Sequence, residues 1–129
     1  MTHPDFKSSA IDGLVGQGYA VLPDYFSRSF TDALLVDLQN LKEAGAFRRA
    51  GTGRNENNQV NDAIRNDQTL WLDGAGTAQA AYLDHMAGLQ DVLNQSLYLG
   101  LSSFESHYAQ YEAGGFYKKH IDSLDLLQK

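Results

Sequence analysis

Cysteine is absent from the 129 residues of this chain, and its absence excludes two kinds of site. Disulfide bonds and thiolate metal sites both require cysteine, so any bound metal must be held by His, Asp or Glu. No apolar run approaches the roughly 18 residues that cross a bilayer. Residues 1–9 also lack the basic start and apolar middle of a secretory signal. We therefore expect a cytoplasmic protein without a membrane partner.

Basic residues are too few for a surface that binds nucleic acid. The chain has 10 Lys and Arg residues against 16 Asp and Glu residues, which gives a net charge of −6. Proteins that bind phosphate backbones gain most of their affinity from clustered Lys and Arg. The pair Arg48-Arg49 is only a short cluster. We expect no nucleic-acid partner, and we attribute the acidity to solubility.

The first third of the chain is predicted to form a helix, a short strand and a second helix. The first helix follows the Ser8-Ser9 pair, which is a suitable N-cap. Residues 19–22 are typical of a strand. The second helix has Ser29 as its N-cap, carries apolar residues at helical spacing and ends at Gly45.

The rest of the chain passes from loop to helix to strands. The predicted elements are, in order, a polar loop over 51–61, an extended segment over 63–72, a helix over 78–99, and strands over 104–111 and 116–122. Gly114-Gly115 is expected to form the turn between the last two strands. Helices come first and strands last, which indicates an α+β fold whose sheet begins late in the chain.

The chemistry of the sequence centres on His120 and Asp122. In a strand, residues two apart point to the same side, so these two side chains can converge on one point. An imidazole nitrogen and a carboxylate oxygen supply two of the three ligands of a facial triad. A third ligand completes one octahedral face and leaves the other open for co-substrate and oxygen. Taken alone the pair is weak, because a strand end whose polar side chains face water has the same spacing.

A longer motif surrounds this pair. Its spacing is Tyr-x-x-Gly-x-x-Tyr-x-x-His-x-Asp, formed by Tyr111, Gly114, Tyr117, His120 and Asp122. The motif resembles the segment that enters the metal site in the prolyl 4-hydroxylase family of Fe(II)/2-oxoglutarate-dependent oxygenases. The resemblance implies that His120 and Asp122 are iron ligands and that Tyr111 and Tyr117 bind 2-oxoglutarate. Ordinary packing of the two tyrosines on a strand face is the alternative.

A second segment, residues 64–72, also resembles this family. It matches the family's Arg-Gly-Asp sequence followed by Trp, with Asn66 in place of the usual Gly. Asn tolerates the left-handed conformation that a Gly would allow. In the family this segment borders the substrate cleft, so Arg65 and Asp67 are expected to contact substrate. The alternative is a local ion pair, which is worth little at a surface. Trp71 is expected to be a core residue.

The resemblance also implies a fold and a division of the chain. The family fold has N-terminal helices packed on a double-stranded β-helix, a cupin-like jelly roll. We expect 1–129 to be a single domain that is one part of a longer protein, with helices and first strands in 1–100 and the start of the β-helix core in 101–129. The family's third iron ligand, and the Arg or Lys that holds 2-oxoglutarate, have no counterpart in this chain. We expect this chain alone to be inactive.

The function implied is a dioxygenase that hydroxylates a C–H bond of a prolyl residue in a peptide or protein. Its cofactors are Fe(II) and 2-oxoglutarate as co-substrate, with ascorbate as reductant. Two alternatives stay open, a non-catalytic cupin-like binding or scaffold module and a small-molecule 2-oxoglutarate oxygenase. The remaining histidines, His3, His85 and His107, are expected to have structural roles, and 51–61 would be a mobile loop beside the active site.

Overall fold

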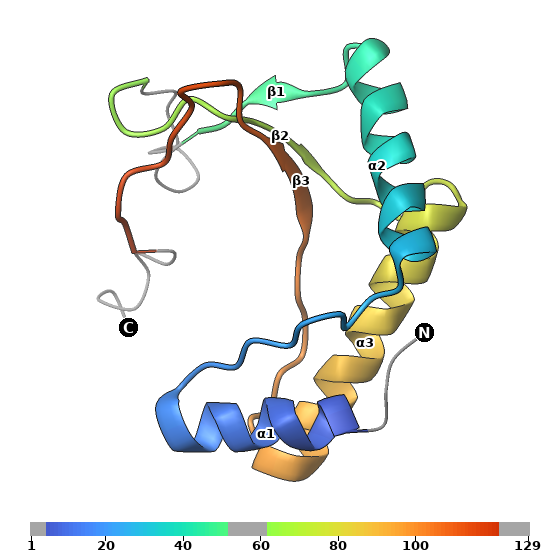
Figure 1. Ribbon diagram of the computed structural model, residues 1–129, viewed down its shortest axis with the longest axis vertical. Helices are drawn as coiled ribbons and strands as arrows, with labels where there is room; N and C mark the ends of the chain where they lie inside the picture. Colours follow the sequence, from blue (N-terminus) through green and yellow to red (C-terminus); the bar gives the residue numbers. More distant parts are fainter. Residues whose placement is uncertain (1–4, 52–61, 122–129) are drawn as a thin grey trace. The chain divides into compact units, whose positions relative to one another are not determined.

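The computed structural model describes residues 5–51 and 62–121, within which three helices and one three-stranded antiparallel sheet form. The elements are, in chain order, helix α1 (Asp5–Gln17), helix α2 (Arg28–Glu43), strand β1 (Arg48–Arg49), strand β2 (Gln68–Trp71), helix α3 (Thr77–Leu97) and strand β3 (His107–Gln110) (Figure 1). This confirms the predicted α+β class. The chain divides into two compact units, a helical unit of Met1–Asn40 with Leu72–Ser106 and a sheet unit of Leu41–Trp71 with His107–Lys129. The predicted loop over 51–61 lies almost wholly outside the described residues.

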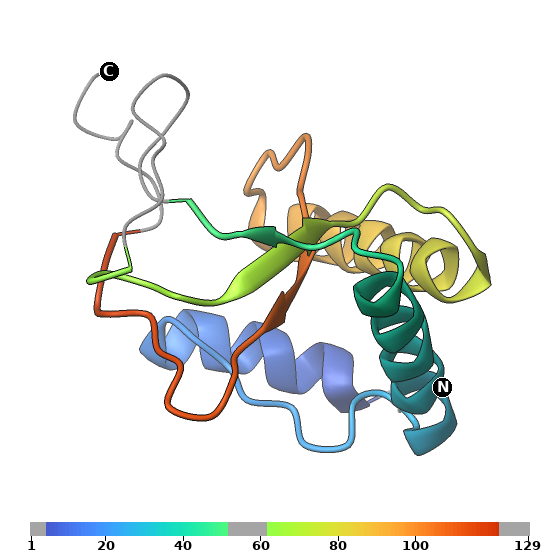
Figure 2. The same ribbon diagram turned by 90° about the horizontal axis from the view of Figure 1, so that it is seen from above.

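In the helical unit, α1 packs against α3, and the chain that leaves α1 turns back closely over it (Figure 2). Gly13 permits this turn. A Cβ atom at Gly13 would lie 2.7 Å from the Cβ of Ala20 and 2.8 Å from the carbonyl oxygen of Tyr19. The predicted strand over 19–22 is wrong, since this segment lies against α1 and pairs with no strand of the sheet.

An aromatic cluster holds the segment before α2 to α3. The Nε2 atom of His85 lies 2.8 Å from the Tyr25 hydroxyl, and the Phe26 ring packs edge-on against His85 at 5.1 Å. Phe30 stacks on Phe26 at 5.0 Å, and Tyr82 tilts against the same ring. Burial raises the pKa of Tyr25. His85 therefore has the packing contacts of a structural residue.

The helix ends are set by local hydrogen bonds that differ in part from the predicted caps. α1 begins at Asp5, so the Ser8-Ser9 pair lies inside the helix rather than at its N-cap. At α2 the cap is Ser27, whose hydroxyl accepts the Phe30 amide at 3.2 Å, and not Ser29. Gly45 does end α2, as predicted, with a φ of 75° that favours glycine.

α3 is held at its start by a buried amide. The side-chain oxygen of Gln79 accepts the backbone amides of Asp73 and Gly74, and its nitrogen donates to Asp37 at 3.0 Å. Gln79 is buried, so these bonds offset the cost of removing a polar group from water. At the other end Tyr98 adopts a left-handed conformation, with a φ of 52°, and terminates the helix.

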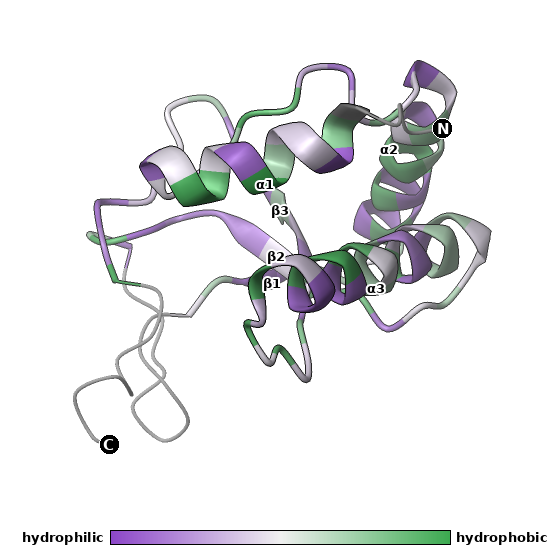
Figure 3. Cartoon of the chain, turned by 90° about the horizontal axis from the view of Figure 1, so that it is seen from below, coloured by the Kyte–Doolittle hydropathy of each residue, from purple (hydrophilic) through white to green (hydrophobic). Residues whose placement is uncertain are grey.

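The helices alternate apolar and polar residues along their length (Figure 3). Several large apolar side chains stay exposed, including Val15 on α1 and the adjacent Leu35 and Val36 on α2. Within the described residues, no helix combines the length and the apolar character that a membrane crossing requires.

The sheet unit is built from β1, β2 and β3 in that order, each antiparallel to its neighbour. β1 was not predicted, because a two-residue strand leaves no periodic signal. Residues opposite one another share a face of a sheet. One face carries Gln68 and Gln110, together with Tyr108, whose ring stacks on buried Phe47 at 6.4 Å. The opposite face, which leads to the candidate site, carries Thr69, Trp71, His107 and Ala109.

Gly13 and Gly88 offer a matched test of the turn over α1. Both lie inside helices, where Ala normally stabilises by up to about 1 kcal/mol. Gly88 has open space around its Cβ position, so we expect Gly88→Ala to raise the free energy of unfolding. Gly13→Ala should lower it, because the new methyl group would meet Ala20 and Tyr19. Urea unfolding monitored by circular dichroism measures both, and equal stabilisation would contradict the close approach.

Candidate functional site

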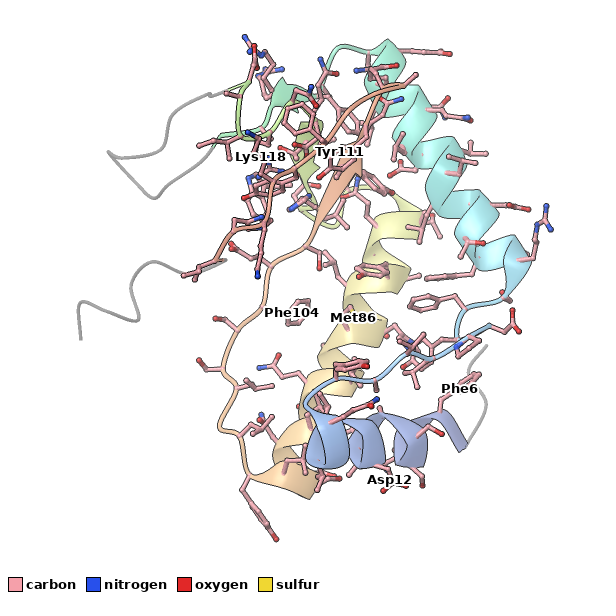
Figure 4. All side chains as sticks on the ribbon, turned by 60° about the vertical axis from the view of Figure 1, so that its left-hand side comes forward. Phe6, Asp12, Met86, Phe104, Tyr111 and Lys118 are labelled. Carbon is pink, nitrogen blue, oxygen red and sulfur yellow. The ribbon has the colours of Figure 1, made fainter. Side chains whose placement is uncertain are left out.

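The two segments that carry the sequence motifs pair with each other in the sheet unit. The Lys118 amide donates to the Ile64 carbonyl at 2.8 Å, and the Asn66 amide donates to the Phe116 carbonyl at 3.1 Å. Arg65 and Tyr117 form an antiparallel bridge between these bonds. Figure 4 shows Tyr111 and Lys118 on the chain that continues from β3. The bridge therefore brings the Arg65–Asp67 segment beside the segment that leads to His120.

Arg65 and Asp67 form a two-point ion pair that is removed from solvent. The Nε and Nη2 atoms of Arg65 donate to the two carboxylate oxygens of Asp67 at 2.7 and 2.6 Å. The Asp67 side chain is 0% exposed and that of Arg65 is 11% exposed. The hydrogen bonds from Arg65 hold the pKa of Asp67 below its ordinary value, and those to Asp67 raise the pKa of Arg65. The sequence suggested a local ion pair at the surface, but the structure shows that the Arg65–Asp67 pair is buried.

Tyr111 joins this pair at the end of β3. Its hydroxyl forms a hydrogen bond with Asp67, which further stabilises the charged carboxylate. Partial burial of the phenol, followed by the negative charge of Asp67, raises the pKa of Tyr111. The phenol therefore keeps its proton and serves as a hydrogen-bond donor at neutral pH.

Tyr117 and His120 continue from Arg65 as a stack of flat groups. The guanidinium carbon of Arg65 lies 3.9 Å from the centre of the Tyr117 ring. The Tyr117 and His120 ring centres lie 3.5 Å apart, with only 7° between their planes. Tyr117 is thus in contact with a planar cation and with an imidazole.

A backbone carbonyl group sets which nitrogen of the His120 ring carries the proton. Its Nδ1 atom lies 2.7 Å from the Lys118 carbonyl oxygen, which can only accept a hydrogen bond. In the neutral ring the proton therefore sits on Nδ1, and Nε2 has the lone pair that a metal requires. The His120 side chain is exposed. Its proposed partner Asp122 lies outside the described residues, and those residues contain no group of three His, Asp or Glu side chains that could hold a metal.

The turn before this segment has the predicted form. Gly114 has a φ of 81°, and the Gly115 amide donates to the Glu112 carbonyl at 2.7 Å. A Cβ atom at Gly115 would lie 2.8 Å from that same oxygen, so the turn requires glycine there. The strand predicted over 116–122 is reduced to the single bridge at Tyr117 within the described part.

Asn66 contributes a contact that the sequence did not reveal. Its side-chain oxygen accepts the Phe116 amide at 2.9 Å, which complements the bond from its own amide to the Phe116 carbonyl. It does not use the left-handed conformation that its replacement of Gly allowed. The Asn in place of Gly two positions before β2 is the sequence feature that could have indicated this bond, because only a polar side chain can accept the Phe116 amide.

Trp71 and His107 lie at the far end of the same sheet face. They are paired across β2 and β3, and their rings meet edge-on at 4.9 Å. Trp71 is 56% exposed, so the prediction that it belongs to the core is wrong. The side chain lies at the end of β2, where its ring contacts His107 and more than half of its surface is exposed.

Replacement of Asp67 by Asn should destabilise the protein strongly and in a pH-dependent way. Removing one partner of a buried ion pair typically costs about 3–5 kcal/mol, because the other charge stays buried. The pKa of Asp67 is lowered from 3.8, so its stabilisation is present above about pH 4 and is lost as pH falls through the folded-state pKa. The gap in unfolding free energy between wild type and Asp67→Asn should therefore shrink in acid.

Asp62→Asn is the matched control for that measurement. Asp62 forms an ion pair with Arg49, but both side chains are more than half exposed. An exposed pair contributes at most about 1 kcal/mol. Urea unfolding between pH 3 and pH 7 compares the variants, and similar losses for both would contradict the buried pair.

Asn66→Ala should loosen the bridge locally. The Phe116 amide loses its side-chain acceptor, at a cost of about 0.5–1.5 kcal/mol, whereas Asn66→Asp keeps an acceptor oxygen. We expect faster hydrogen exchange at the Phe116 amide in Asn66→Ala than in Asn66→Asp. Equal exchange rates in the two variants would rule out this hydrogen bond.

No protein-family model matches this chain, and no curated protein sequence matches it. Among solved structures, the chain is similar to the crystal structure of a prolyl-4-hydroxylase from Pseudomonas putida, with 31% sequence identity and a TM-score of 0.84 over 92% of this chain. It spans 62% of the length of that protein. The chain therefore has the fold of the corresponding part of a prolyl 4-hydroxylase, and the complete jelly roll stays a prediction.

Proposed function

We propose that this chain is the metal-binding part of an Fe(II)- and 2-oxoglutarate-dependent dioxygenase of the prolyl 4-hydroxylase type. One observation carries the proposal. Two motifs that are far apart in the sequence meet through the Arg65–Tyr117 bridge, and the imidazole of His120 is held beside them. The similarity to the Pseudomonas putida prolyl-4-hydroxylase supports the same assignment.

The donor atoms fit an iron site in which His120 binds through Nε2. The Lys118 carbonyl supports this choice, because it holds the proton on Nδ1. Asp122 would add a carboxylate oxygen, and a third protein ligand would come from outside this chain. Iron, when bound with 2-oxoglutarate, supplies the oxygen chemistry that inserts a hydroxyl group into a C–H bond. The protein binds and orients the reactants and limits access of water.

Tyr111 and Tyr117 are proposed to form part of the 2-oxoglutarate site. The Tyr111 phenol is protonated and donates to the Asp67 carboxylate, so a bond to a 2-oxoglutarate carboxylate would replace the bond to Asp67. Arg65 and Asp67 are proposed to border the substrate cleft. Asp67 is fully buried, so its influence on substrate would be indirect, through the groups that it holds in place.

The proposed substrate is a prolyl residue in a peptide or protein, and the name of the similar Pseudomonas putida enzyme supports this class. Ascorbate is proposed as the reductant that maintains the iron, and the cytoplasm as the location. A small-molecule substrate would leave the metal site intact and change only what enters the cleft.

A thermal-shift measurement tests the metal site. We expect Mn(II) with N-oxalylglycine to raise the melting temperature of the protein that contains this chain, and His120→Ala to abolish the increase. His107→Ala is the control, because His107 is an exposed histidine of the same unit that contacts Trp71. An unchanged increase in His120→Ala would contradict the proposal. The absence of any increase in wild type would favour a non-catalytic binding module.

A further inference from the structure

We infer that Arg65 and Tyr117 are positioning residues for the His120 imidazole, and that buried Asp67 anchors them. The stack of guanidinium, phenol and imidazole would fix the His120 ring before a metal arrives. As a statement about metal affinity this rests on the proposed function, but the orientation of the ring can be tested without metal. The roles go beyond the substrate contact and 2-oxoglutarate contact proposed for these residues.

The first step is the immobilisation of the Arg65 guanidinium. Two of its nitrogens bind both oxygens of Asp67, whose side chain has no exposed surface. The third nitrogen, Nη1, donates to the Gly51 carbonyl at 3.3 Å. A planar group held at all three nitrogens cannot rotate freely.

The second step passes this rigidity to Tyr117. The Arg65 cation lies 3.9 Å from the centre of the phenol ring, within the range of a cation–π contact. The backbone bridge between the same two residues fixes where the ring emerges. Contact with Arg65 therefore restrains the orientation of the ring, and the bridge fixes the backbone that carries it.

The third step is the orientation of His120. Its ring lies nearly parallel to the Tyr117 ring, 3.5 Å between centres, while the rest of the side chain is exposed. Contact with the Tyr117 ring restrains its plane, and the hydrogen bond to the Lys118 carbonyl oxygen sets its tautomer. Groups that orient a metal-binding histidine typically change metal affinity by about 10–100-fold when removed.

The variants separate the flat ring of Tyr117 from its hydroxyl. Tyr117→Leu removes the stack, and Tyr117→Phe keeps the ring while it removes the hydroxyl. We expect Tyr117→Leu to weaken Mn(II) binding about 10–100-fold in the absence of 2-oxoglutarate, and Tyr117→Phe to stay within about threefold of wild type. Paramagnetic resonance of free Mn(II) during titration of the full-length protein measures both. Equal losses in the two variants would overturn the positioning role.

Arg65→Lys tests the upstream half of the stack. Lysine keeps the charge but loses the planar group and the two-point bond to Asp67. We expect this variant to weaken Mn(II) binding at least threefold. Mn(II) affinity equal to wild type in the folded variant would remove Arg65 from the proposal.

Proton NMR of the metal-free protein provides the second readout. A stacked phenol shifts the His120 ring protons upfield, so Tyr117→Leu should move them downfield and Tyr117→Phe should not. If wild type shows the upfield shift but binds no Mn(II), the proposed function fails and the stack stands. If wild type binds Mn(II) and the His120 protons are the same in all variants, the metal site stands and the stack fails.

Discussion

The buried ion pair between Arg65 and Asp67 is the interaction on which the candidate site depends. A carboxylate without solvent exposure is stable only when its charge is paired and its oxygens are bonded, and here Arg65 and Tyr111 meet both conditions. The pair is also directional, because a guanidinium fork matches a carboxylate in one plane. The paired guanidinium lies over the Tyr117 ring, 3.9 Å from its centre, so the ion pair also contacts the next group of the site.

Backbone pairing and side-chain stacking act on the same two segments. The bridge at Arg65 and Tyr117 sets the separation of the two segments. The side chain of Asn66 adds a hydrogen bond between them by accepting the Phe116 amide. The glycine turn at 114–115 makes the return of the chain possible, since a side chain at Gly115 would collide with the Glu112 carbonyl. A short stretch of irregular backbone can thus be as well defined as a strand, because its polar groups are bonded across the gap.

The sequence allowed the α+β class, the end of α2 at Gly45 and the turn at Gly114 to be predicted, since each depends on local residues with a clear physical signature. The meeting of the two motifs could be expected only from family resemblance. The stack of Arg65 on Tyr117 could not be predicted, because it depends on register between segments that are 52 positions apart. Residues 19–22 show the opposite error, because these β-prone residues form no strand and instead pack against α1 at Gly13.

Burial decreases steadily along the proposed stack, and this gradient explains how one site can be both rigid and accessible. Asp67 is fully buried, Arg65 is largely buried, Tyr117 is half-buried and His120 is exposed. An exposed ligand is accessible to a metal but is poorly ordered by itself. A fully buried ligand would be ordered but closed to the metal. Each flat group packs against the next, so the buried carboxylate restrains the orientation of the exposed imidazole through Arg65 and Tyr117. The imidazole itself stays open to solvent.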